Sequence, residues 1–84
     1  MGKVMVVYKI YPKEEKEAGE IMDQLDEMKD IKSAKKEPVA FGLEIVKAGA
    51  LIDDDDDPDR VQEELEEKIE GYRNIEQGEA TLIS

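Results

Sequence analysis

The chain has 84 residues, of which 42% are charged and 39% hydrophobic, so we expect one small domain over residues 1–84. It carries 23 acidic and 12 basic residues, and the resulting net charge of −11 opposes binding to nucleic acid or to an anionic membrane. It has no Cys and no His, which excludes disulfides, Cys/His metal sites and imidazole acid-base catalysis. We therefore expect no enzyme activity, no catalytic residue, no cofactor and no small-molecule substrate.

The sequence also predicts a cytoplasmic protein. No apolar run approaches the roughly 20 residues that span a bilayer, and the longest, Val4–Val7, lacks the cleavage features of a signal peptide. Basic residues gather in the first half: residues 1–47 hold nine Lys against ten acidic residues, whereas residues 48–84 hold three basic residues against thirteen. Contact with an acidic partner would therefore belong to the first half.

The first two elements are a strand and a helix. Residues 3–11 are dense in Val, Ile and Tyr and end at Pro12, which is typical of a strand and its exit. From Lys13 onward, apolar residues recur at the i, i+3, i+4 spacing of a helix with one buried stripe. That stripe consists of Ala18, Ile21, Met22, Leu25 and Met28.

Two further strands follow. Residues 31–39 are polar, rich in Lys and interrupted by Pro38, which predicts an edge strand. Residues 43–52, read as LEIVKAGALI, have the apolar content of a central strand.

The second half begins with five carboxylates, Asp53–Asp57, which repel one another and require an exposed turn. Asp57 as N-cap and Pro58 as first helical residue predict a helix that stops at Gly71, with Val61, Leu65 and Ile69 as its apolar stripe. Residues 72–84 are a weaker strand pattern, and Gly78 indicates a bulge. The order of strand, helix, strand, strand, helix, strand predicts a ferredoxin-like βαββαβ sandwich of the α+β class, with two helices on one face of a four-stranded antiparallel sheet.

The acidic turn invites a metal interpretation. Asp53, Asp55, Asp57 and Glu64 fit positions 1, 3, 5 and 12 of a calcium loop, but position 6 is Pro58 instead of the Gly that makes the sharp turn. We therefore expect a solvated helix-capping turn and no specific metal site.

Nucleic-acid and phosphate sites are also disfavoured. Tyr8 and Tyr11 are three residues apart on one strand and face opposite sides, so they form no stacking platform for RNA. An acylphosphatase-like enzyme of the same fold needs an Arg in the loop after the first strand, where this chain has Pro12 to Glu15.

The segment Glu37–Leu43 differs from the rest. Pro38 and Gly42 constrain its backbone, and Phe41, the only Phe, stands at a strand junction outside any apolar stripe. Phe41 either closes the end of the core or is presented to a partner as a hot spot, and the pattern leaves both open.

Two segments carry a family resemblance: Lys3–Pro12, read as KVMVVYKIYP, and Glu37–Leu43, read as EPVAFGL. With them, the chain resembles the archaeal elongation factor 1-beta proteins, the exchange-factor domain family of elongation factor 1-beta, over essentially its whole length. The resemblance implies a guanine-nucleotide exchange factor for the GTPase elongation factor 1-alpha in translation elongation.

The resemblance also implies partner-binding residues at two places. In the family the Phe-Gly segment faces the GTPase, and the last residues reach towards its magnesium and phosphate site. No Lys or Arg follows Arg73 here, so we expect the last strand to act by shape and backbone contacts. The alternative is a ferredoxin-like module that binds a small ligand or a protein without exchange activity. The expected partner-binding residues are Pro38, Ala40, Phe41, Gly42, Leu82, Ile83 and Ser84.

Overall fold

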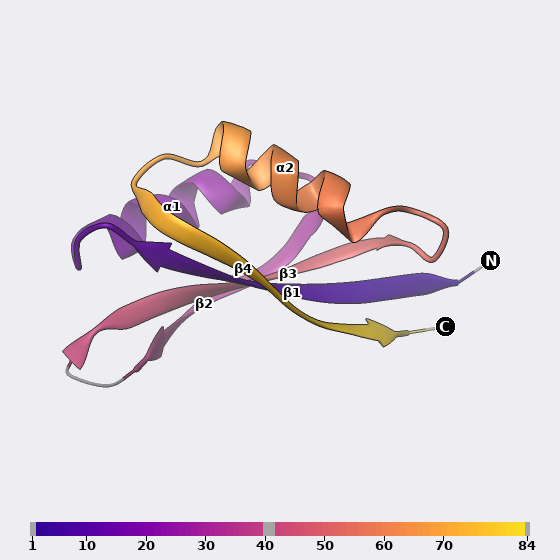
Figure 1. Cartoon of the computed structure of the whole chain (residues 1–84), viewed down its shortest axis with the longest axis horizontal. Helices are drawn as coiled ribbons and strands as arrows, with labels where there is room; N and C mark the ends of the chain where they lie inside the picture. Colours follow the sequence, from indigo (N-terminus) through magenta and orange to yellow (C-terminus); the bar gives the residue numbers. More distant parts are fainter. Residues whose placement is uncertain (1, 40–41, 84) are drawn as a thin grey trace.

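A computed structural model of the chain describes residues 2–39 and 42–83 and has the predicted order of elements. The four strands form one antiparallel sheet in the order β2-β3-β1-β4, and both helices lie on the same side of it (Figure 1). The ferredoxin-like fold is therefore confirmed. The elements are β1 (Lys3–Pro12), α1 (Glu17–Asp26), β2 (Ile31–Pro38), β3 (Glu44–Asp53), α2 (Pro58–Lys68) and β4 (Tyr72–Leu82).

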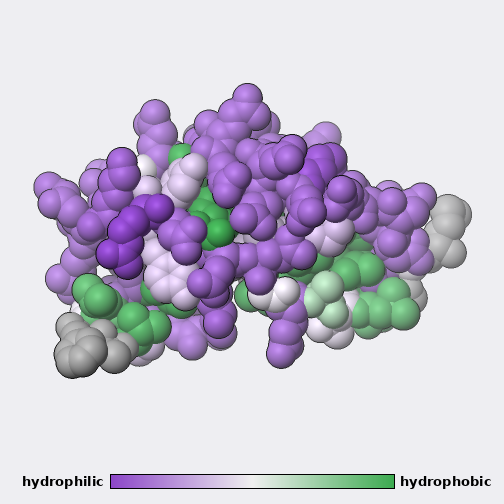
Figure 2. Space-filling view, in the orientation of Figure 1, coloured by the Kyte–Doolittle hydropathy of each residue, from purple (hydrophilic) through white to green (hydrophobic). Residues whose placement is uncertain are grey.

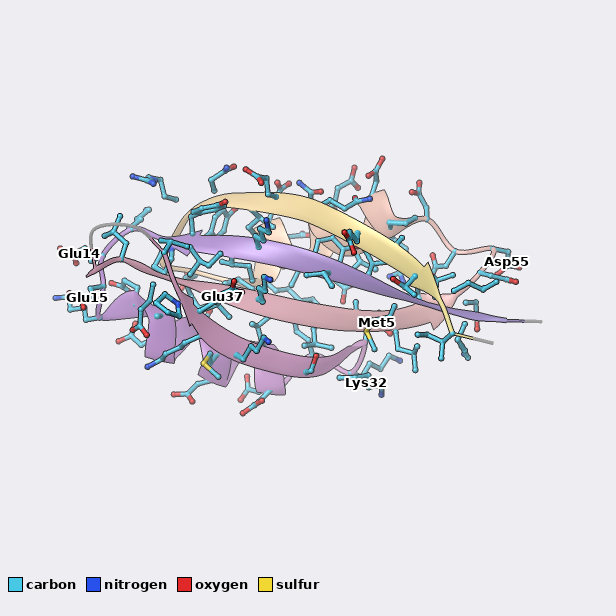
Figure 3. All side chains as sticks on the ribbon, turned by 90° about the horizontal axis from the view of Figure 1, so that it is seen from below. Met5, Glu14, Glu15, Lys32, Glu37 and Asp55 are labelled. Carbon is cyan, nitrogen blue, oxygen red and sulfur yellow. The ribbon has the colours of Figure 1, made fainter. Side chains whose placement is uncertain are left out.

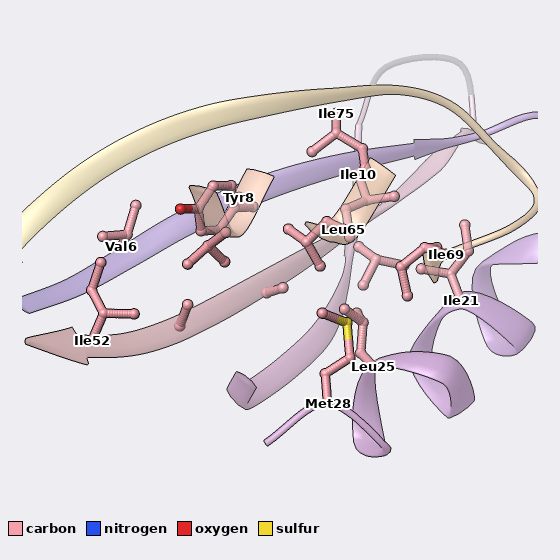
Figure 4. Packing of buried hydrophobic residues seen from close by; sticks show 14 of the residues in the cluster. Val6, Tyr8, Ile10, Ile21, Leu25, Met28, Ile52, Leu65, Ile69 and Ile75 are labelled. Carbon is pink, nitrogen blue, oxygen red and sulfur yellow. The ribbon is translucent and has the colours of Figure 1, made fainter. Parts of the chain in front are cut away.

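The core lies between the sheet and the helices (Figure 4). β1 contributes Val6, Tyr8 and Ile10, whose side chains are fully buried because every second residue of a strand points to the same face. β1 is paired on both sides, with β3 and with β4. The helices add Ile21 and Leu65, which are also fully buried. The prediction that β2 is an edge strand and β3 a central strand is confirmed.

α1 begins later than the sequence pattern suggests, at Glu17 instead of Lys13. Residues 13–16 carry no apolar side chain that could anchor a helical turn on the sheet, and Lys16, the N-cap, makes no side-chain capping bond. Met28 lies beyond the end of the helix but is only 8% exposed. The sequence pattern thus predicts the burial of Met28 correctly, although the helix ends before this residue.

α2 begins as predicted. The Asp57 side chain accepts a hydrogen bond from the Asp59 N–H at 2.9 Å, and Pro58 occupies the first turn. Arg60 pairs with Asp56 at 2.7 Å and with Glu64 at 3.1 Å. The hydrogen bond from Arg60, together with the Asp57 N–H, lowers the pKa of Asp56 below its ordinary value.

A short irregular segment, residues 69–71, connects α2 to β4. The helix ends at Lys68, and Ile69 is already extended although its side chain stays buried. Gly71 has φ +90, a left-handed conformation that glycine adopts without strain. The side chain of Gln24 on α1 bonds both backbone groups of Glu70, each at 2.9 Å, and so ties α1 to this connection.

The predicted irregularity in β4 is present. Val6 pairs with Ala80 and Tyr8 with Gln77, so Gly78 and Glu79 together face one residue of β1. This is the two-against-one arrangement of a β-bulge. In the described ranges, 2–39 and 42–83, the two helices are too short and too polar to cross a membrane.

The cap at Asp57 gives a first prediction. Asp57→Ala is expected to lower the free energy of unfolding by about 1 kcal/mol, because the Asp59 N–H loses its acceptor. Urea titration followed by circular dichroism measures this. Asp55→Ala removes an equal charge from an exposed position of the same turn and should change stability by less than about 0.5 kcal/mol. Equal losses in the two variants would assign the effect to net charge.

The buried hydroxyl of Tyr8 gives a second prediction. It donates a 2.7 Å hydrogen bond to the Pro58 carbonyl, and burial raises the Tyr8 pKa to about 12. Tyr8→Phe should therefore cost about 1 kcal/mol at pH 7. Because the pKa is raised in the folded state, the stabilisation is complete below pH 10 and is lost as pH rises from about 10 through 12.

The test is urea unfolding of wild type and Tyr8→Phe at several pH values from 7 to 12. Wild-type stability should fall more steeply above pH 10 than that of Tyr8→Phe, so the two curves converge. Parallel curves over that range would contradict the assignment of the raised pKa to Tyr8.

Candidate partner-binding site

One candidate region is the connection between β2 and β3. The Val39 N–H donates to the Leu43 carbonyl at 2.8 Å and closes a short loop over residues 39–43. Gly42 has φ +74, a conformation that other residues rarely adopt, so glycine is required by the backbone. Val39 and Leu43 are 40% and 54% exposed. Ala40 and Phe41 lie outside the described residues, so the direction of Phe41 stays an open prediction.

A surface cavity of about 240 Å³ adjoins this loop. Val39, Leu43, Tyr11 and Ile45 are among its apolar lining residues, and its charged lining residues are Lys13, Glu14, Glu15, Glu44 and Arg73. We call Val39, Leu43, Tyr11 and Ile45 the loop-end cluster. A partner side chain that entered the cavity would gain apolar contact from two strands and the loop at once.

The second candidate region is the end of β4. Leu82 pairs with Val4, and the Ile83 N–H donates to the Lys3 carbonyl at 2.8 Å. The backbone is thereby held by β1, while the side chains of Leu82 and Ile83 are 67% and 55% exposed. We call Leu82 and Ile83 the C-terminal pair. Ser84, also expected to bind the partner, lies outside the described residues.

The two regions lie at opposite ends of the sheet. Leu82 pairs near the start of β1, whereas Tyr11 borders the loop-end cavity near the end of β1. The molecule measures 41 × 24 × 17 Å, and Figure 2 shows apolar surface at both ends of its longest dimension. The fold thus groups Pro38 and Gly42 with Val39 and Leu43, and it separates them from Leu82 and Ile83. One partner must span most of the molecule to contact both.

Charge differs between the two sides of the sheet. The side of the helices carries many exposed acidic residues, whereas the open side, seen from below in Figure 3, carries Lys9, Lys35 and Lys47. Lys47 pairs with Glu37 at 2.8 Å. The ion pair with Lys47, aided by the charges of Lys35 and Lys9, lowers the pKa of Glu37. The sequence analysis did not identify these lysines as a group, because their alignment depends on strand register.

The acidic turn has structural partners. Asp57 caps α2, Asp56 pairs with Arg60, Asp53 pairs with Lys3, and Asp54 accepts from the Gly2 N–H at 3.2 Å. Within residues 2–39 and 42–83, there is no cluster of three or more acidic side chains arranged to hold a metal ion. The carboxylates of the turn therefore stabilise the start of β1 and the start of α2 through hydrogen bonds and ion pairs.

Comparison with solved structures supports the fold. A chain described as "Crystal structure of PH0061" superposes on this one with a TM-score of 0.70 at 20% sequence identity. The superposition covers 99% of this chain and 53% of the other, so this chain spans about half the length of that protein. At this identity the similarity concerns the fold alone. No curated protein matches the sequence.

Comparison with protein families identifies the chain more closely. The sequence model of the EF-1 guanine nucleotide exchange domain matches residues 5–81, which is nearly the whole chain. The match contains most of β1, the β2–β3 loop and most of β4, and so includes the loop-end cluster. This chain therefore belongs to the EF-1 guanine nucleotide exchange domain family, which acts in translation elongation.

Proposed function

We propose that this chain promotes the exchange of GDP for GTP on elongation factor 1-alpha by binding the nucleotide-free GTPase in preference to the GDP-bound form. The observation that carries the proposal is the exposure of Val39 and Leu43 in the loop-end cluster and of the C-terminal pair, on a chain of this family. Exposed large apolar side chains on a surface otherwise dominated by charge are typical of protein-binding sites.

Exchange of this kind needs no bond chemistry in the factor. If the factor binds the empty GTPase more tightly than the GDP complex, its binding must weaken GDP by the same ratio. A thousandfold weakening corresponds to a difference in binding free energy of about 4 kcal/mol. One or two well-packed anchor residues supply that much at many interfaces. GDP then dissociates, and GTP takes its place.

The two regions have different parts in this proposal. The segment with Pro38, Ala40, Phe41 and Gly42 binds the GTPase as an anchor. On either side of it, Val39 and Leu43 are joined by a backbone hydrogen bond. Flanking residues that are ordered before binding lose less entropy on association. The C-terminal residues Leu82, Ile83 and Ser84 contact the nucleotide-binding part of the GTPase.

The end of β4 contributes to exchange by shape. Arg73 is the last basic residue of the sequence, and it lies near the loop-end cavity at the other end of the sheet. No lysine in this segment can replace the charge of a magnesium ion. The backbone of Leu82 and Ile83 is hydrogen-bonded to β1 at Val4 and Lys3, so their apolar side chains contact the partner from a fixed position.

The third prediction tests the anchor. Release of a fluorescent GDP analogue from elongation factor 1-alpha is measured with the wild-type protein, Phe41→Ala and Leu43→Ala. The wild type should accelerate release, and each variant should need about tenfold more protein for the same rate, because an apolar anchor is truncated. Leu43 is 54% exposed, so its truncation should leave the melting temperature nearly unchanged.

Met22→Ala serves as the matched control. Met22 is a half-buried apolar residue of α1, on the side of the sheet away from the proposed site. It should retain the wild-type exchange rate once the protein is folded. If the wild type does not accelerate GDP release at micromolar excess, the exchange proposal is wrong and the binding-module alternative takes its place.

The fourth prediction tests the C-terminal pair. Leu82→Ala combined with Ile83→Ala should reduce the maximal rate of GDP release at saturating factor more than it reduces the affinity. The loop-end variants should do the opposite, because the loop anchors the complex and the strand end perturbs the nucleotide site. Saturation curves of the release rate separate the two effects. Identical behaviour of both sets of variants would contradict the division of roles.

A further inference from the structure

Three lysines form a row across the open side of the sheet. Lys35 of β2 is paired in register with Lys47 of β3, and Lys47 is paired in register with Lys9 of β1. Residues directly opposite one another on neighbouring antiparallel strands point to the same face, with Cβ atoms about 5 Å apart. The row therefore places three positive charges side by side on three adjacent strands. We call Lys9, Lys35 and Lys47 the lysine row.

This arrangement is electrostatically unfavourable in the free protein. Like charges directly opposite one another destabilise a sheet. Glu37 compensates Lys47, to which it is paired at 2.8 Å. In the described ranges, neither Lys9 nor Lys35 lies within ion-pair distance of a carboxylate, although Glu76 is opposite Lys9 on β4. The face thus has capacity to accept a further negative charge.

A hollow lies next to the row. Lys9, Lys47, Val7, Gly78 and Glu79 line a surface cavity of about 240 Å³. It lies beside the bulge in β4. Its lining includes two lysines and one glutamate, and the depression is large enough for a carboxylate side chain of a partner.

Apolar side chains flank the row on both sides along the strands. Met5 and Leu51 are cross-strand partners, half-buried, on the side towards the C-terminal pair. Figure 3 shows Met5 and Glu37 well apart along the sheet on this face. Towards the other end lie Tyr11 and Ile45 of the loop-end cluster. Between the two proposed contact regions, the face therefore has the lysine row in the middle and apolar side chains on either side of it along the strands.

We propose that this open sheet face is a docking surface for a protein segment that places an acidic side chain at the lysine row, between apolar side chains that contact Met5 and Tyr11. The inference rests on the proposed function, and the segment belongs to the GTPase partner. Along the strands, the lysine row lies between the loop-end cluster and the end of β4, so a partner that contacts both ends along the open face passes over it. Leu82 itself is opposite Val4 and points to the helix side.

The observations favour a carboxylate of a protein over a nucleic acid. Glu37, Glu76 and Glu79 stand beside the three lysines, so the local positive charge is small. A phosphate backbone, with one charge for each nucleotide, would be repelled by these carboxylates and by the net charge of −11. Tyr11 provides one aromatic ring at the margin, which is insufficient for base stacking. A single carboxylate with apolar neighbours matches both the small positive charge of the lysine row and the apolar side chains on either side of the row.

Two neighbouring residues supply a matched test. Lys35→Glu reverses a charge in the lysine row, and Lys36→Glu makes the same change on the same strand but on the other face, since Lys36 is paired with Val46. Dissociation constants for nucleotide-free elongation factor 1-alpha are measured at low and at physiological salt. Lys35→Glu should weaken binding about tenfold at low salt and reduce its salt dependence, while Lys36→Glu should change binding less than twofold.

The melting temperature of the two variants is a second measurement, for which the expected order differs from that for binding. Lys35→Glu removes a like charge from beside Lys47, so its melting temperature should not fall below that of Lys36→Glu. Weaker binding without loss of stability supports a docking role. If the wild type binds and accelerates GDP release but the two variants bind equally, the docking inference fails while the exchange function stands. If the wild type does not bind the GTPase, both proposals fail.

Carbodiimide cross-linking identifies the contact directly. This reagent joins a lysine amine to a carboxylate only where the two groups touch, and mass spectrometry of the complex should find Lys9, Lys35 or Lys47 linked to an Asp or Glu of the partner. Links confined to lysines of the helix side would overturn the proposal. A labelled single-stranded RNA is titrated in parallel, and tight binding that Lys35→Glu abolishes would assign the face to nucleic acid instead.

Discussion

The alternation of side chains along β1 is the constraint on which the rest of the structure depends. β1 is paired on both sides, so its register fixes which residues of β3 and β4 share each face. Val6, Tyr8 and Ile10 point to the helices and build the core, while the residues between them point to the open side. A slip of one residue would bury Lys9 and expose Tyr8, and the cost of burying that charge makes the register unique.

The same register separates the charges of the molecule into two sides. The helices turn their acidic faces to solvent, and the acidic turn is used to cap α2 and to hold the first residues of β1. On the open side, the register places Lys9, Lys35 and Lys47 in a row, with Met5 and Tyr11 along β1 on either side of it. An acidic partner surface would be repelled by the helix side. On the open side Glu37, Glu76 and Glu79 offset the lysines, so attraction there requires an acidic side chain placed at the lysine row itself.

The proposed exchange mechanism needs rigidity and shape where an enzyme needs reactive groups. Neither apolar region contains an acid, a base or a nucleophile, but both are held by backbone hydrogen bonds, from Val39 to Leu43 and from Ile83 to Lys3. Such fixed contacts can favour one conformation of a GTPase over another, since the differential binding energy is all that is required. The separation of the regions along the sheet lets one factor act on two parts of its partner together.

The sequence by itself determined the order of the elements, the edge position of β2, the cap at Asp57, the bulge at Gly78 and the family, because spacing, turn residues and local motifs carry that information. It misplaced the start of α1, since the first turn of a helix is decided by what it can pack against. It also did not identify the lysine row, nor Val39 and Leu43 as exposed apolar residues of the loop-end cluster. Lys9, Lys35 and Lys47 are scattered along the chain, and only the pairing of three strands places them side by side.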